Sequence, residues 1–330
     1  MKDTRSLYEN DYRDFSKKTL KATKYIGSLI GLAVGDALGA PVEFLPRDTF
    51  ERIEYYRSGG KFNVAPGEYT DDTAMALCLA QSLIDCRGCD QKDQLNKYLR
   101  WFEKGYMSAT GRSIGCGKTV LRALQRFQLK DCAECGNSRL RRGAGNGSLM
   151  RIAPVALYYA DAPETAMKMA EKSSYTTHGL KICADACRLY TGLIIGALQG
   201  RKKKELLSED YFEILCAFDE KYRYDDEIRT VMQGSYRSKS RNEIKSGGYV
   251  VDTLEAALWA FYRTDSFDEG LLLAVNLGFD ADTVGAVYGQ LAGAYYDYDG
   301  IDKKFLEGIL GRERIVAIAL QLYKERFCEI

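Results

Sequence analysis

Apolar residues recur at three- and four-residue spacing along most of the chain, which is the pattern of helices that bury one face. Strict two-residue alternation, the pattern of half-buried strands, is almost absent. The sequence therefore predicts an all-α fold. The clearest helical segments are residues 73–84, 121–127, 180–198, 206–218 and 312–327.

Proline supports this prediction. All five prolines lie in the first half of the chain, and residues 164–330 contain none. Proline breaks helices, so a long proline-free stretch with apolar periodicity favours them. Asp252 and Glu255, with Thr253 and Leu254 between them, are expected to form a capping box at the start of one such helix.

Glycine recurs every fourth residue in two apolar segments. Because residues four apart share one face of a helix, each segment predicts a helix with a glycine stripe. Glycine lowers helix stability, so the stripes indicate close backbone contact between two helices. Their ends are then expected to meet at one site. The stripes are Gly27, Gly31, Gly35 and Gly39, and Gly285, Gly289 and Gly293.

The chain shows no linker, low-complexity tract or repeat of solenoid length. We therefore expect one compact helical domain over residues 25–330, preceded by a charged segment over residues 1–24. Charged residues also cluster at 201–205 and 221–245. Both clusters are expected to be solvated faces, the second a helix followed by a loop.

The charge balance excludes some classes of partner. The 330 residues include 47 Lys and Arg and 46 Asp and Glu, which leaves a net charge of +1. Such a chain has neither the basic surface of a nucleic-acid-binding protein nor a polybasic membrane anchor. The longest apolar candidate for a membrane span, residues 28–42, is short and contains Asp36. The first residues lack the apolar core of a signal peptide, so we expect a cytoplasmic protein.

Two C-x-x-C pairs stand out among the 10 cysteines, Cys86 with Cys89 and Cys132 with Cys135. Together they could form a four-cysteine zinc site, although their separation exceeds the usual zinc-ribbon spacing. The alternative is reduced thiols in surface loops, as expected in a cytosolic chain.

Acidic residues form the strongest chemical pattern. Residues 69–73 (Tyr-Thr-Asp-Asp-Thr) and 278–283 (Gly-Phe-Asp-Ala-Asp-Thr) each precede an apolar helix. Capping of the helix N-terminus would explain one side chain in each motif. It does not explain why both motifs combine two carboxylates with hydroxyls. Oxygen ligands suit hard cations such as Mg²⁺ or Mn²⁺, and several carboxylates in one pocket repel each other unless cations neutralise them.

These motifs and several others give the chain a resemblance to the ADP-ribosylglycohydrolase family, of the dinitrogenase-reductase-activating type. The resemblance spans about residues 25–297, and ordered motifs are more specific than any single one. The matching segments are residues 31–44, 69–76, 145–154, 176–178, 248–257 and 280–286.

The resemblance implies an all-α fold with two Mg²⁺ or Mn²⁺ ions. The implied metal ligands are Thr70, Asp71, Asp72, Asp280, Asp282 and Thr283, which agrees with the acidic pattern above. It implies catalytic roles for Glu43, Asp71 and Asp282, with Glu43 on a mobile loop over the site. Asp36, inside an apolar helix, is expected to need a buried partner and to support the site.

The implied pocket for ADP-ribose involves a glycine-rich loop, whose backbone can approach phosphates closely, and the single histidine of the chain. Tyr249 is a candidate to stack on adenine. The expected substrate-binding residues are Gly143, Gly145, Asn146, Gly147, Ser148, His178, Gly248 and Tyr249.

The chain departs from the family at two positions. Gly115 lies where members of the dinitrogenase-reductase-activating type carry an aspartate that is assigned as a base, and Phe279 lies where members often have Gly or Asp. The expected function is metal-dependent hydrolysis of the bond between ADP-ribose and a protein side chain, most simply arginine. The alternatives are a catalytically inactive protein that binds ADP-ribose or only keeps the fold, and a hydrolase of serine-linked or small-molecule conjugates.

Overall fold

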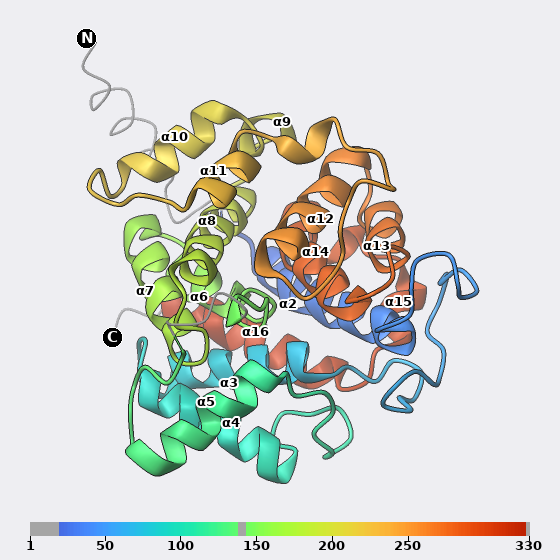
Figure 1. The fold of residues 1–330 in the computed structure, drawn as a ribbon, viewed down its shortest axis with the longest axis horizontal. Helices are drawn as coiled ribbons and strands as arrows, with labels where there is room; N and C mark the ends of the chain where they lie inside the picture. Colours follow the sequence, from blue (N-terminus) through green and yellow to red (C-terminus); the bar gives the residue numbers. More distant parts are fainter. Residues whose placement is uncertain (1–19, 138–142, 328–330) are drawn as a thin grey trace.

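The computed structural model describes residues 20–137 and 143–327, most of which lie in helices (Figure 1). Within these ranges, the strand-like pairing consists of two isolated β-bridges, between Gly59 and Val64 and between Gly145 and Tyr249. The all-α prediction is confirmed. The helices are α2 (Ala22–Gly39), η2 (Ala40–Val42), α3 (Asp71–Asp85), α4 (Gln91–Lys104), α5 (Lys118–Lys130), α6 (Ala153–Tyr158), α7 (Pro163–Tyr175), α8 (Lys181–Leu198), α9 (Lys203–Leu206), α10 (Glu209–Ala217), α11 (Asp226–Met232), η4 (Ser235–Arg237), α12 (Val250–Arg263), α13 (Phe267–Val275), α14 (Ala281–Tyr296), η5 (Tyr298–Gly300), α15 (Lys303–Gly308) and α16 (Arg312–Phe327).

Helices α2 and α14 form the centre of the fold and run antiparallel (Figure 1). Their glycine stripes face each other, as predicted. A Cβ atom built on any of these stripe glycines would overlap backbone atoms of the other helix. The backbones therefore touch directly, and the end of α2 meets the start of α14. The facing pairs are Gly27 with Gly293, Gly31 with Gly289, and Gly35 with Gly285, and Gly39 lies against the backbone of Ala281 and Asp282.

The remaining helices surround this pair. Helices α3, α8, α12, α13 and α16 each contact α2, α14 or both. In Figure 1, α9, α10 and α11 cover one end of the molecule, and α4 and α5 lie at the opposite end. One large hydrophobic cluster runs through most of these elements. The surrounding helices bury most of α2 and α14, and the most apolar 18-residue window of Ala22–Val42 lies inside the fold although the segment is long enough to cross a membrane.

Most predicted helices are present, with two differences at their ends. The segment 206–218 is divided, because α9 ends at Leu206 and the Ser208 hydroxyl accepts a hydrogen bond from the Tyr211 amide to start α10. The capping box at 252–255 is wrong, because α12 already begins at Val250. Glu255 instead forms an ion pair with Lys239, with the nearest atoms 2.6 Å apart.

The segment 221–245 contains α11 and η4 joined by loops, in agreement with the expected helix and loop. The division at residue 24 stays a prediction, because residues 1–19 lie outside the described part of the chain. Residues 22–24 form the first turn of α2.

The zinc-site alternative for the cysteines is wrong, and the reduced-thiol alternative holds for only one of the two pairs. Cys132 and Cys135 are joined by a disulfide, so they are not reduced thiols. Nor do the two pairs combine into a four-cysteine site, because in the described ranges both groups close enough to hold a metal consist of carboxylates alone. Cys86, at the end of α3, and Cys89, which accepts a hydrogen bond from Gln94, remain free thiols.

Candidate active site

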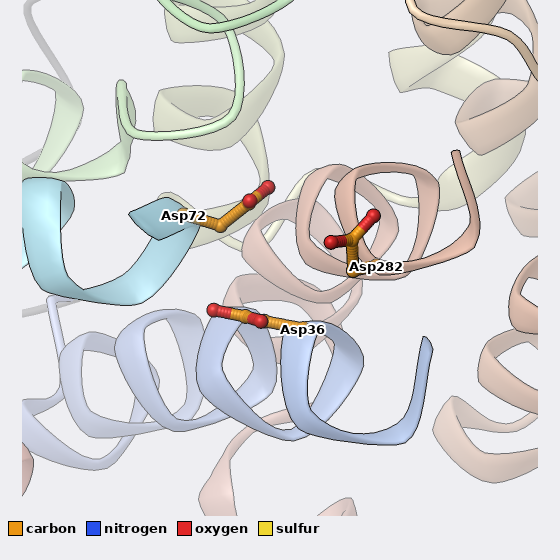
Figure 2. Close-up of side chains that lie close together, drawn as sticks. All are labelled: Asp36, Asp72 and Asp282. Atoms are coloured by element: carbon orange, nitrogen blue, oxygen red, sulfur yellow. The ribbon is translucent and has the colours of Figure 1, made fainter. Parts of the chain in front are cut away.

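Three carboxylates from three central helices point into one shared space (Figure 2). Asp36 lies on α2, Asp72 in the first turn of α3, and Asp282 in the first turn of α14. One oxygen of each lies within 4.8 Å of an oxygen of the other two. Glu43, Asp280 and Asp282 form a second such group. Because Asp282 belongs to both, the groups make one continuous acidic cluster where α2 ends and α14 begins.

Asp36 holds the start of α3 in place. It accepts hydrogen bonds from the backbone amides of Thr70 and Thr73, at 2.9 and 3.0 Å, and from their hydroxyls, at 2.8 and 2.6 Å. The amides at a helix start have no partners within the helix, and no side-chain cap comes from Thr70 itself. A carboxylate on α2 thus caps α3 across the fold. This is the buried partner that Asp36 was expected to need.

Burial, and then mutual repulsion, disfavour the charged forms of the clustered carboxylates in the absence of cations. Burial and then the charges of neighbouring carboxylates raise the pKa of Glu43 to about 8 and that of Asp71 to about 7. The same causes place the pKa values of Asp72 and Asp282 well above the usual range. Burial raises the pKa of Asp36 to about 6, although its hydrogen bonds from Thr73 and Thr70 oppose this.

The cluster has the donor set that hard divalent cations prefer. Glu43 Oε2 and Asp72 Oδ1 are buried and have no hydrogen-bond partner among the described residues. Buried carboxylate oxygens are costly unless they are paired, protonated or bound to a cation. Oxygen-rich sites of this kind suit Mg²⁺ or Mn²⁺. The residues present therefore fit a divalent-cation site.

A cavity of about 490 Å³ opens above the cluster. It brings together eleven of the predicted site residues and leaves four outside its lining. Those that line it are Glu43, Asp71, Asp72, Asp280, Asp282, Thr283, Gly145, Asn146, Gly147, His178 and Gly248. Those that do not are Thr70, Gly143, Ser148 and Tyr249.

The glycine-rich loop lies against the acidic cluster. The Asn146 amide nitrogen Nδ2 donates to Asp280, at 2.6 Å, and to the Thr253 hydroxyl, at 2.8 Å. The Asn146 backbone amide donates to the Gly248 carbonyl, at 3.2 Å. A Cβ atom on Gly147 would lie 2.8 Å from His178 Cε1, so only glycine lets this backbone pass the imidazole ring.

His178 is buried and neutral. Burial, with a smaller contribution from Arg151, lowers the pKa of its imidazole to about 3. Arg151 donates to the Thr177 hydroxyl oxygen, at 2.6 Å, which leaves that hydroxyl free to donate to His178 Nδ1, at 2.8 Å. This pairing suits the neutral tautomer that carries its proton on Nε2, the nitrogen on the side of Gly145 and Gly147. In that tautomer, His178 can act as a hydrogen-bond donor into the cavity.

The four predicted residues outside the lining have other contacts or positions. Thr70 donates its hydroxyl to Asp36, and Ser148 accepts a hydrogen bond from Ser174, at 2.9 Å, beneath the loop. The Tyr249 hydroxyl donates to Glu227, at 3.1 Å, and the residue lies just before α12. Gly143 lies at the edge of the described part of the chain.

Sequence reasoning missed the apolar and basic parts of the lining. The first turn of α5 contributes Lys118, Thr119 and Val120, and Met150 lies below the loop. Three phenylalanines line the cavity as well: Phe44, Phe62 and Phe279. Phe44 directly follows Glu43 and Phe279 directly precedes Asp280, so proximity to a carboxylate in the sequence was the available signal.

Comparison with known proteins agrees with this architecture. The family model for ADP-ribosylglycohydrolase matches residues 17–329. The ADP-ribosylarginine hydrolase Tri1 of Serratia proteamaculans is 36% identical over 297 residues, covering 90% of this chain and 78% of that protein. The ADP-ribosyl-[dinitrogen reductase] glycohydrolase of Rhodospirillum rubrum is 30% identical over 285 residues, covering 85% and 88%.

A solved structure described as an ADP-ribosylglycohydrolase-related protein complex superimposes with a TM-score of 0.80 at 41% identity. The match covers 92% of this chain and 98% of that one. The fold, the acidic cluster at the joined ends of α2, α3 and α14, and these matches lead to one assignment. The chain belongs to the ADP-ribosylglycohydrolase family.

Proposed function

We propose that this protein hydrolyses the glycosidic bond between ADP-ribose and an arginine side chain of a modified protein, reversing mono-ADP-ribosylation. The observation that carries the proposal is the cavity that combines the acidic cluster with the glycine-rich loop and His178. The names of the relatives from Serratia proteamaculans and Pseudomonas putida, both ADP-ribosylarginine hydrolases, favour arginine as the acceptor.

Two divalent cations, Mg²⁺ or Mn²⁺, are part of the proposal. The unpartnered oxygens of Asp72 and Glu43 support it. Bound divalent cations supply positive charge that neutralises carboxylates, orients sugar hydroxyls and activates water. The proposed ligands are Thr70, Asp71, Asp72, Asp280, Asp282 and Thr283.

Different groups of the chain are proposed to bind different parts of the substrate. The backbone of Gly145 and Gly147 and the Nε2 proton of His178 are suited to the diphosphate, and Lys118 adds positive charge at the start of α5. The carboxylates face the sugar, where cleavage at the anomeric carbon develops positive charge that they stabilise. Glu43, which follows η2 and lines the cavity, is the proposed group that orients the attacking water or transfers a proton.

The test is release of free ADP-ribose from arginine-linked and serine-linked protein, in Mg²⁺, Mn²⁺ or EDTA. We expect release from the arginine-linked substrate that EDTA abolishes. Asp71→Ala is expected to abolish turnover and leave the fold intact. Asp265→Ala, at a fully exposed position, is the matched control and should behave as wild type. Full turnover by Asp71→Ala would defeat the assignment of the site.

Gly115 favours one competing function, a non-catalytic protein that binds ADP-ribose. This residue lines the cavity at the position where the family resemblance implies an aspartate base. Under this alternative, the protein binds free ADP-ribose but releases no ADP-ribose from either the arginine-linked or the serine-linked substrate, whether Mg²⁺ or Mn²⁺ is present. Cleavage of the serine-linked substrate alone would instead identify a different acceptor.

A further inference from the structure

Two exposed phenylalanines flank the acidic end of the cavity. Phe44 is 56% exposed and Phe279 is 45% exposed, and both line the cavity. Their backbones are paired: the Phe44 amide donates to the Phe279 carbonyl, at 2.5 Å, and the Phe279 amide donates to the Leu45 carbonyl, at 2.7 Å. This pairing joins the two phenylalanines at the mouth of one cavity, which Glu43 and Asp280 also line.

Both residues also adopt a backbone conformation that phenylalanine disfavours. The φ angle is +67° at Phe44 and +56° at Phe279, in the left-handed region where glycine or asparagine is usual. An exposed aromatic ring in a left-handed conformation costs stability twice over, through strain and through lost burial. Folding does not explain two such residues side by side, which indicates a role in binding.

Phe62 is the third phenylalanine of the cavity lining, and the three rings together are called the aromatic wall. Its ring lies edge-on to the ring of Phe44, with centroids 6.3 Å apart, and it packs over Ala40, Val64 and Ile114. Phe62 is therefore anchored from below. It also lines a smaller hollow of about 280 Å³ that adjoins the cavity through Gly115 and Cys116. Phe62 thus continues the aromatic lining from the cavity into this adjoining hollow.

Aromatic faces next to carboxylates recognise a flat cation. The ring faces attract positive charge, and a planar guanidinium stacks on them while its N–H groups reach nearby oxygens. We propose that Phe44, Phe62 and Phe279 form an acceptor subsite that stacks on the guanidinium of the modified arginine and selects it over serine. This inference rests on the proposed function and extends it to the origin of acceptor specificity. A serine acceptor is short and uncharged, and gains nothing from such a wall.

The decisive variants keep the backbone and change only the rings. Phe44→Leu retains an apolar side chain and removes the aromatic face, and Phe44→Tyr restores that face. Phe279→Gly removes the ring and suits the left-handed backbone. Leu45→Ala is the matched control, because Leu45 is 40% exposed, adjoins Phe44 and does not line the cavity.

The measurements are KM and kcat for arginine-linked and serine-linked ADP-ribosyl peptides, and the affinity for free ADP-ribose by calorimetry. Phe44→Leu and Phe279→Gly should each raise KM for the arginine peptide by roughly 2- to 30-fold, the range expected for a stacked cation. Phe44→Tyr and Leu45→Ala should keep the wild-type KM. The affinity for ADP-ribose and the KM of any serine-linked turnover should not change.

Two results would overturn the subsite, and they are distinguishable. If the wild-type enzyme cleaves the arginine peptide but the ring variants keep its KM, or weaken free ADP-ribose equally, the rings do not recognise the acceptor. If the wild-type enzyme releases nothing from the arginine peptide, the proposed function fails and the arginine subsite fails with it. The subsite is supported only if the ring variants raise KM for the arginine-linked peptide and leave the affinity for free ADP-ribose unchanged.

Discussion

Gly115 lies directly against Asp71: a Cβ atom built on Gly115 would overlap Asp71 Oδ1 and lie 3.1 Å from its Cγ. The φ angle of Gly115 is +73°, so any other residue there would also be strained. The Asp71 carboxylate thus occupies space that a side chain at 115 would need. Both the position of Asp71 and the backbone conformation therefore require glycine at residue 115, where the family pattern has an aspartate.

Gly115→Ala should reduce activity far more than it reduces stability. The added methyl group must displace the Asp71 carboxylate, and a shift of about 1 Å in a catalytic group can cost about 100-fold in rate. Gly111→Ala is the control, because Gly111 has a φ of +80° but open space around its Cβ position. Both variants should lose about 1–2 kcal/mol of unfolding free energy from strain. Equal activity of the two would refute the role of the Asp71 contact.

Asp72→Asn should abolish turnover and stabilise the metal-free protein. Burial and four neighbouring carboxylates raise the pKa of Asp72, so its charged form destabilises the fold unless a cation is bound. Removing the charge should add about 1–3 kcal/mol to the unfolding free energy in EDTA. Mg²⁺ should then stabilise the variant less than it stabilises the wild-type protein. Urea denaturation with and without Mg²⁺ measures both effects, and Asp265→Asn at an exposed position provides the control.

The metal-free protein should lose stability as the pH rises. Burial raises the pKa of Asp36 to about 6, that of Asp71 to about 7 and that of Glu43 to about 8. These groups bind protons more tightly in the folded state than in the unfolded state, where their pKa values are about 4. Their contribution is complete below about pH 4 and is lost as the pH rises through about 6 to 8.

Urea midpoints in EDTA should therefore fall between pH 5 and pH 8. Saturating Mg²⁺ should flatten the decline, because cations replace the protons as the neutralising charge. His178 should oppose this decline below about pH 6.5, because its pKa is about 3 in the folded protein and about 6.5 in the unfolded chain, so only the unfolded chain binds a proton there. The decline is therefore clearest between about pH 6.5 and pH 8. A stability that rises with pH over that interval in EDTA would show that the carboxylates are not mutually repulsive in the folded protein.

The sequence pattern predicted those features that depend on local spacing. A glycine every fourth residue weakens a helix, and only direct backbone contact compensates, so the pairing of α2 with α14 could be inferred. The duplicated Asp and Thr motifs likewise predicted the acidic site. Each glycine stripe and each Asp and Thr motif lies within a short stretch of sequence, so each could be recognised without a structure.

Features that depend on distant partners could not be inferred in this way. Asp36 caps α3 through Thr70 and Thr73, which lie 34 and 37 residues away with no local signal between them. Tyr249 was expected to stack on adenine, which stays a prediction, and its hydroxyl contacts Glu227, 22 residues away, a partner that the sequence does not indicate. The phenylalanines that line the cavity were missed for a similar reason. Nothing in the sequence predicts that the backbone of Phe44 or Phe279 adopts the left-handed conformation.

Gly35→Ala should separate α2 from α14 and remove activity with it. In an isolated helix, this substitution would add about 1 kcal/mol of stability. Here the Cβ atom would overlap the carbonyl oxygen and carbon of Gly285, and a helix backbone cannot rotate aside as a side chain can. We expect a loss of about 3 kcal/mol or more, at the upper end of overpacking effects.

Gly192→Ala on α8 is the matched control for this prediction. Gly192 is also buried in a helix, but its Cβ atom would meet only side-chain atoms of Leu215, which can move. It should therefore lose much less stability in urea and keep its turnover. Because Glu43 follows α2 and Asp282 begins α14, even a small separation in Gly35→Ala should move these carboxylates apart. A Gly35→Ala protein with wild-type stability would show that the glycine stripes are not what holds the two helices in contact.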